Sequence, residues 1–304
     1  MKKLTLKEQL IALSLKGYTY RSCWYYVQYV LHELPTTQLD LQTCHQVMLH
    51  LAHQNIIPLE AMNVFLELSA EDFERIETLA QMAIAIDEAT YPALWHEIPK
   101  PPLVVYYRGD LSLLQKSLVS LVGTRQVTLY GRTITEQMTQ AIVNQGWVAV
   151  SGLATGIDQI VHETACAHQS NSTIAIIPTG FNHAYPPQNH ALQQQLSQQH
   201  LVLSEYLPEV NARKHHFIMR NRLVAGISSA TLVMEAARQS GSLITANFAL
   251  QYNRELYAVP GRITDKTSQG CNEIIASGAM PILSVEETLQ GLKRLFSIHQ
   301  ILGN

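Results

Sequence analysis

The feature that most constrains the fold is a regular alternation of apolar runs and amphipathic stretches after about residue 100. The runs are short, rich in β-branched residues and apolar on both faces, which is typical of strands in a buried parallel sheet. This alternation predicts right-handed βαβ units and an α/β fold with a doubly wound, mostly parallel sheet. The expected strands are SLVSLVGTR, GWVAVSGLA, STIAIIPTG, HLVLSEY, ATLVMEA and ELYAVPG, and the expected helices are GRTITEQMTQAIVNQ, IDQIVHETACAHQ, NHALQQQLSQQ, FIMRNRLVAGIS and SLITANFALQYN.

The N-terminal part of the chain has a different pattern. LKEQLIALSLKG and CWYYVQYVLHEL carry apolar residues at helical spacing, and Ser69 is a candidate helix cap followed by acidic residues. The segment EIPKPPLVVYYRGD, with three prolines, is expected to be a linker or an entry strand. We therefore expect a small all-α domain over residues 1–95 and the α/β domain over 96–304, which ends in one amphipathic helix, SVEETLQGLKRLFSIHQ.

Composition excludes several classes of protein. With 47% hydrophobic and 15% charged residues the chain is too apolar to be disordered, and no apolar run is long enough to span a membrane. Four cysteines without a CxxC pair favour free thiols in a cytoplasmic protein, and the 13 histidines form no HExxH motif, so no metal is expected. A net charge of -3 excludes a globally basic nucleic-acid binder but not a local basic patch.

Small residues gather where the expected strands end. The loops at Gly123, at Ser151–Gly152 and at Ser240–Gly241–Ser242 are each followed by a helical pattern. Glycine lets backbone N–H groups approach a ligand, and helix N-termini favour anions, so a phosphate-like ligand is expected near these loops. GxGxxG, GxxxxGK[ST] and GxSxG motifs are absent. For any single loop, a tight turn with a helix cap is the simpler interpretation.

The segment RKHHFIMRNRLVAG is basic although the chain is nearly neutral. Its cations suit a polyanion, and Phe217 offers a surface on which a base can stack. At about 100° per residue, Arg220 lies about 60° from Phe217 on a helix, and Arg222 about 140°. We therefore expect Lys214, Phe217 and Arg220 to lean towards DNA. Core packing remains the alternative for Phe217.

Arg222 is expected to turn inward instead, to a carboxylate such as Glu205 or Glu235. Pairing with an internal carboxylate also remains the alternative for Arg220.

From Tyr91 to Leu283 the order of motifs resembles the DprA/Smf family of DNA-processing proteins. The motifs are VGTR, SGLATGID..VH, TIAIIPTG....YPPQN, LVLSEY, F..RNRLVAGIS, MEA...SGSLITA..A, VPG and G.NEIIASGA. The resemblance implies an extended Rossmann-like fold. Some members carry a sterile-alpha-motif-like domain at the N-terminus, which is one model for the helical part here. Because only about 20 residues follow GAMPIL, we expect no C-terminal winged-helix domain.

The resemblance also implies a function. Members bind single-stranded DNA, protect incoming strands and load the RecA recombinase during natural transformation; they form homodimers through the Rossmann domain and need neither catalysis nor a cofactor. The family motifs map to Gly123, Thr124, Arg125, Lys214, Phe217, Arg220, Asn221 and Arg222, and the strand-end loops add Ser151, Gly152, Ser240, Gly241 and Ser242 as candidate DNA-binding residues. A RecA-binding surface is expected around Cys271–Leu283.

One alternative belongs to another class of protein. Lysine-decarboxylase-like phosphoribohydrolases share a Rossmann fold and cleave nucleoside monophosphates. Their PGGxGTxxE pattern is missing from the loop where this chain has EAARQSGSLITA. A binding protein is therefore favoured over an enzyme.

Overall fold

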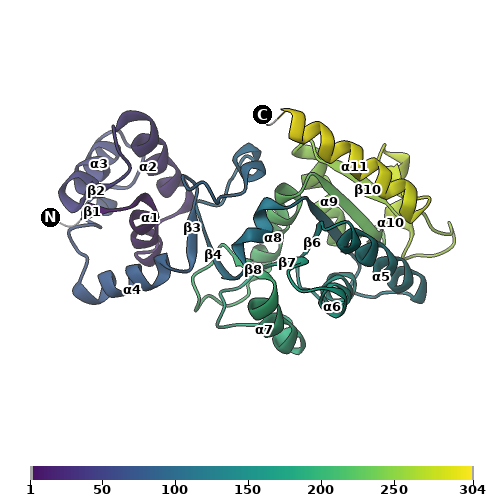
Figure 1. Cartoon of the computed structure of the whole chain (residues 1–304). Helices are drawn as coiled ribbons and strands as arrows, with labels where there is room; N and C mark the ends of the chain where they lie inside the picture. The colour runs from purple at the N-terminus through teal and green to yellow at the C-terminus, as the bar shows by residue number, and fades with distance from the viewer. Residues whose placement is uncertain (1–2, 303–304) are drawn as a thin grey trace. The chain divides into compact units, whose positions relative to one another are not determined.

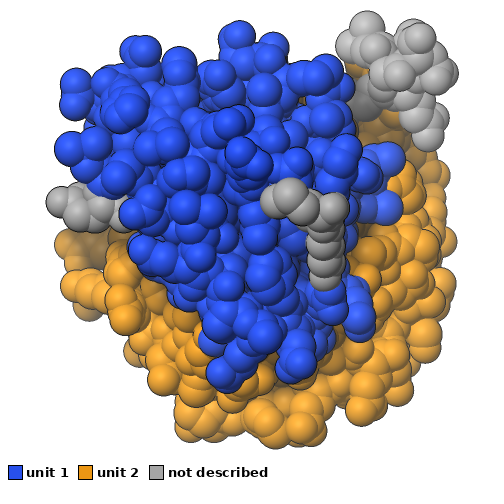
Figure 2. Space-filling model, turned by 90° about the vertical axis from the view of Figure 1, so that its left-hand side faces the viewer, with its two compact units in different colours: residues 1–91, 102–106 blue, residues 92–101, 107–304 orange. Residues whose placement is uncertain are grey.

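The computed structural model describes residues 3–302. The chain divides into two compact units. Unit 1 contains Met1–Tyr91 and Pro102–Tyr106, and unit 2 contains Pro92–Pro101 and Tyr107–Asn304; Figure 2 colours them separately.

Unit 1 is mainly helical. Thr5 and Glu8 form a capping box at the start of its first helix. Ser69 accepts a hydrogen bond from the backbone N–H of Asp72, so the cap expected from the sequence is confirmed. The helices are α1 (Leu6–Leu15), α2 (Tyr20–Glu33), α3 (Leu41–His53) and α4 (Ala70–Ala80), and the short strands are β1 (Lys3–Leu4), β2 (Leu39–Asp40) and β3 (Ala83–Ala85).

Unit 2 contains a parallel sheet whose strands run in the order β11-β10-β9-β5-β6-β7-β8. Its strands are β5 (Leu118–Gly123), β6 (Val148–Ser151), β7 (Thr173–Ile177), β8 (Leu201–Ser204), β9 (Ala230–Glu235), β10 (Glu255–Ala258) and β11 (Met280–Pro281). The proline-rich segment leads into β4 (Val104–Gly109), whose first residues pair with β3. All six strands expected from the sequence are therefore confirmed, and β11 is an addition.

Helices cover both faces of this sheet (Figure 1). Val119 and Leu121 of β5 point into a core formed with α5, α6 and α11, whereas Ser120 between them donates a hydrogen bond to Val224 O of α8. The helices are α5 (Leu129–Asn144), α6 (Ile157–His168), α7 (His190–Gln199), α8 (Lys214–Ile227), α9 (Ser242–Gln251), α10 (Gln269–Ala276) and α11 (Val285–Leu302). The α/β architecture with a doubly wound sheet, predicted from the sequence, is thus confirmed, while α10 was not expected.

Within the described residues, no helix is both long enough and apolar enough to cross a membrane. The four cysteines are free thiols, and Cys23, Cys44 and Cys271 are buried.

Candidate functional site

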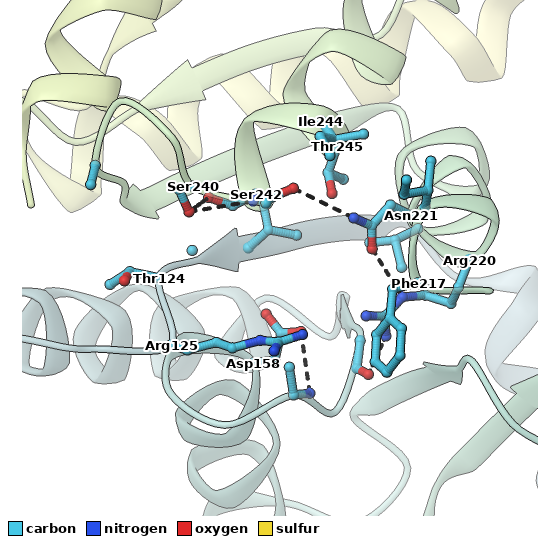
Figure 3. A pocket seen from close by; sticks show the side chains of 18 of the residues that line it. Thr124, Arg125, Asp158, Phe217, Arg220, Asn221, Ser240, Ser242, Ile244 and Thr245 are labelled. Carbon is cyan, nitrogen blue, oxygen red and sulfur yellow. Dashed lines mark hydrogen bonds between the residues drawn. The ribbon is translucent and has the colours of Figure 1, made fainter. Parts of the chain in front are cut away.

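The position of the site follows from the strand order. From β5 the chain winds outwards through β6, β7 and β8, and then returns to place β9 on the other side of β5. The loops after β5 and β9 therefore diverge and leave a crevice at the carboxyl ends of these strands, where ligands bind in open α/β sheets. A cavity of about 550 Å³ lies here, lined by the loops after β5, β6 and β9 and by α8 and α9 (Figure 3).

Glu235, at the end of β9, positions the loop after β5. Its backbone oxygen accepts a hydrogen bond from Thr124 N at 2.7 Å, and its carboxylate accepts one from Thr128 N at 2.9 Å. The side chain is buried, so these bonds are shielded from water. The loop that carries Arg125 is thereby fixed, while the Arg125 side chain itself remains exposed.

The loop after β6 is tied to its surroundings from two directions. Ile157 N donates to Thr124 O at 3.1 Å, which joins it to the loop after β5. Leu153 has a φ of 60°, which is uncommon for a leucine, and its carbonyl accepts a hydrogen bond from the buried side chain of Asn189 at 3.0 Å. Asn189 belongs to the YPPQN motif, so part of that motif has a positioning role.

Arg220 forms the floor of the cavity. Its side chain is only 5% exposed, and Nη1 donates to the carbonyls of Gly152 and Ile176, the latter at 2.7 Å. A β-carbon on residue 152 would collide with the guanidinium, so a larger residue there would have to displace the Arg220 side chain. Arg220, expected to lean towards DNA, does line the cavity, but it is buried and its donors bond to backbone carbonyls. That it contacts DNA stays a prediction.

Asp158, in the first turn of α6, is a carboxylate beside this cation. It lines the cavity and is 8% exposed. Burial raises its pKa, against the opposing effect of Arg220 and Arg125. Burial lowers the pKa of Arg220, and Asp158 opposes that shift. Because arginine stays protonated in proteins, Arg220 is a cation, and the neighbouring Asp158 carboxylate offsets part of its charge.

An aromatic ring and polar groups complete the walls. The Arg125 guanidinium lies 5.6 Å from the ring centre of Phe217, within the range of a cation–π contact. The Asn221 amide contacts the Gly241 carbonyl at 3.5 Å, and the hydroxyls of Ser240 and Ser242 are hydrogen-bonded at 2.7 Å where α9 begins. Figure 3 shows these groups around one opening. The N-terminus of α9 adds a positive dipole end that favours an anion.

Arg222 points away from the cavity, as the helical geometry predicted. It is 2% exposed, its Nη2 donates to both carboxylate oxygens of Glu205, and its Nη1 donates to Lys100 O. Of the two carboxylates predicted as partners of Arg222, Glu205 is the one that pairs with it. Glu235 instead accepts a hydrogen bond from Thr128 N in the loop after β5. Arg222 is thus placed as a structural cation and does not line the cavity.

Most of the candidate residues converge on this cavity. Two others lie elsewhere: Ser151 is buried and donates to Leu121 O, and Lys214 is exposed at the first position of α8. The candidates that line the cavity are Gly123, Thr124, Arg125, Gly152, Phe217, Arg220, Asn221, Ser240, Gly241 and Ser242. Asp158 was missed, although its position at the start of a helix directly after the glycine loop was a usable signal.

Chemically, the cavity combines a buried cation, an exposed cation, an aromatic ring and a helix N-terminus. These groups suit a phosphate and a planar base. In the part of the chain that is described, no group of three or more histidine, cysteine, aspartate or glutamate side chains is arranged to hold a metal ion.

Comparison with known proteins gives a consistent result. The family model described as DNA recombination-mediator protein A matches residues 82–293. DNA processing protein DprA of Bacillus subtilis is 40% identical over 210 residues, which cover 69% of this chain and 70% of that protein. The crystal structure of DprA from Streptococcus pneumoniae matches with a TM-score of 0.80 and 32% identity, over 95% of this chain and 98% of that chain. A structure of DNA processing protein A from Helicobacter pylori, reported for its single-stranded DNA binding mode, has a TM-score of 0.64 and 30% identity, over 70% of this chain and 96% of that chain.

Proposed function

Because the chain belongs to the DNA recombination-mediator protein A family, we propose that it binds single-stranded DNA in the cavity between β5 and β9. One observation carries the proposal: Arg125, from the loop after β5, meets Phe217 and Arg220 of α8 around one cavity at the switch point of the sheet. Arg125 and Arg220 supply the charge for a phosphate, and Phe217 supplies a ring for a base. The Helicobacter pylori relative, whose reported structure concerns single-stranded DNA binding, supports the same ligand class.

The finer role is also a proposal. We propose that the protein acts without catalysis or a cofactor in the cytoplasm, as a homodimer that protects incoming strands and loads RecA during natural transformation. Family membership supports this role, and four free thiols are compatible with a reducing compartment. Around Cys271–Leu283, the proposed RecA surface, Met280 is 38% exposed and Leu283 71% exposed, so apolar side chains are available to a protein partner.

The test measures binding of a 35-mer poly(dT) by fluorescence anisotropy and by gel filtration. Replacing Arg125 by alanine removes a charge-assisted contact, and we expect affinity to fall about ten-fold or more. Arg132→Ala is the matched control, because Arg132 is an exposed arginine of α5 paired with Glu136 outside the cavity. Gel filtration of the free protein reports whether it is a dimer.

Salt dependence separates a phosphate contact from a nonspecific loss of structure. For single-stranded DNA, each neutralised phosphate contributes about -0.7 to the slope of log K against log salt. Lys214→Ala should therefore reduce the slope by about 0.7 and leave the circular dichroism spectrum unchanged. Equal affinity of wild type, Arg125→Ala and Lys214→Ala would exclude the proposed site. Release of free base from nucleoside monophosphates would favour the hydrolase alternative, for which Asp158 would be the carboxylate to examine.

A further inference from the structure

A second cavity adjoins the first across a pair of aromatic rings. It has a volume of about 430 Å³ and lies beneath the loop between β7 and α7, lined by Tyr185 and by residues 179–190 and 211–212. The Tyr185 and Phe217 ring centres are 4.9 Å apart with planes at 69°, an edge-to-face contact. Phe217 lines the first cavity and Tyr185 the second, so this aromatic pair links the linings of the two cavities.

Tyr185 has a surface that remains available for stacking. The residue is 40% exposed, whereas tyrosine is a residue type of intermediate burial in folded proteins. An edge-to-face pair uses the edge of one ring and one face of the other, so it leaves ring faces uncovered. Phe217 already has the Arg125 guanidinium nearby, which leaves Tyr185 as the more open of the two rings.

The polar groups of the second cavity suit a base better than a phosphate. Asn182, His190 and Asn211 are exposed, and within the described residues their side chains make no hydrogen bond to the protein. Amide and imidazole groups supply the donors and acceptors that pair with the edges of bases. The described lining contains no lysine or arginine, so it offers no strong site for a phosphate.

The cations lie instead between the two cavities along the chain. Ala212 lines the second cavity and Phe217 the first, and the exposed Arg213 and Lys214 come between them. A DNA strand that passes over Tyr185 and Phe217 would therefore have Arg213 and Lys214 near its phosphates. It would also have one cavity on each side of the two rings for a base. Positive charge along the backbone and aromatic rings for the bases are the features by which proteins bind single strands.

We propose that the cavity beside Tyr185 is a second base-binding subsite, which takes the nucleotide next to the one held at Phe217 and Arg220. The subsite rests on the proposed function, because it extends the same DNA track. Tyr185 stacks on the base, while Asn182, His190 and Asn211 contact its polar edge.

The first test measures affinity for 35-mer poly(dT) by anisotropy. Tyr185→Ala is expected to lose about five-fold or more, the lower end of what one stacked base contributes, while Tyr185→Phe keeps the ring and stays within two-fold of wild type. Tyr25→Ala is the matched control, since Tyr25 is 37% exposed on α2 in unit 1. The Asn182→Ala/Asn211→Ala variant, which leaves both rings in place, is expected to lose about three-fold or more.

A second readout separates direct contact from a loosened Phe217. Poly(dT) containing 4-thiothymidine is photocrosslinked to the wild-type protein and the adducts are mapped by mass spectrometry. Adducts are expected both near Phe217 and within residues 182–190. Adducts confined to the Phe217 side, or wild-type affinity in Tyr185→Ala or in the asparagine variant, would overturn the subsite. If Arg125→Ala still lost its affinity, the proposed function would stand, whereas absence of binding by wild type would overturn both.

Discussion

The buried pair of Arg222 and Glu205 allows the structural side of α8 to be tested apart from DNA binding. Glu205→Gln keeps the size of the side chain but removes its charge. The buried Arg222 is then left with the Lys100 carbonyl and a neutral amide, and its Nε already has no partner in the described structure. Removing one partner of a buried pair costs about 3–5 kcal/mol. With a urea m-value of about 3 kcal/mol/M, the unfolding midpoint should fall by about 1–1.7 M.

The assay needs a signal from unit 2 alone, because a chain with two units need not unfold in a single step. The sequence contains three tryptophans, of which Trp24 lies in unit 1 and Trp95 and Trp147 lie in unit 2. A Trp24→Phe background therefore makes tryptophan fluorescence report the unfolding of unit 2. The measurement is the urea midpoint of Glu205→Gln in that background.

Two further variants decide the interpretation. Glu136→Gln breaks the exposed pair with Arg132, whose side chains are 46% and 50% exposed, and should cost no more than about 0.5 kcal/mol. Glu205→Gln/Arg222→Met replaces the stranded cation by an apolar side chain and should recover much of the loss. A shift for Glu205→Gln no larger than that for Glu136→Gln would refute the reasoning. Unchanged poly(dT) affinity of the folded Glu205→Gln/Arg222→Met variant would show that Arg222 is not a DNA contact.

Two other predictions concern buried groups of unit 2. Gly152→Ala places a β-carbon against the Arg220 guanidinium. We expect the free energy of unfolding, measured in urea, to fall by about 2 kcal/mol or more, and poly(dT) binding to weaken. Gly241→Ala is the control and should leave stability unchanged, because nothing lies within 4 Å of the added carbon. Burial lowers the pKa of His162 to about 3, below the value of about 6.5 in an unfolded chain. The contribution of neutral His162 to stability is therefore complete above pH 6.5. It is lost as the pH falls towards 3, by up to about 1.4 kcal/mol per pH unit. His162→Leu should flatten this fall in unfolding free energy between pH 6.5 and 4, and an equally steep fall in both proteins would contradict the assignment.

The six strands β5 to β10 were predictable because each is a short, mostly buried apolar run, a pattern that needs no long-range information. The exposed β11 lacks this pattern and was missed. Helix α10 was missed because eight residues are too few to establish a helical period, and because the same segment was considered only as part of a family motif. The carboxyl ends of parallel strands lie at one edge of a sheet, so the sequence also predicts that the loops after β5, β6 and β9 lie together. The structure confirms this, because all three line the cavity.

Side-chain partners were less predictable, because they depend on distances between elements. Helical angles correctly turned Arg222 away from Phe217, yet they did not distinguish Glu205 from Glu235 as its partner. An angle also gives direction and not depth, which is why Arg220 was expected to be open and is buried. Its burial depends on the carbonyls of Gly152 and Ile176, which belong to other strands and loops.

The two cations of the cavity, Arg220 and Arg125, differ in the conformational entropy that each side chain loses when a ligand binds. Arg220 is already immobilised by carbonyl acceptors, so a phosphate that enters its field requires no further ordering of that side chain. Arg125 is exposed, so it must be ordered when a ligand binds. We therefore infer that Arg220 sets where the negative charge rests, and that Arg125 closes over it. The two cations therefore differ in burial, while Arg222 and Glu205 pair on the far side of α8.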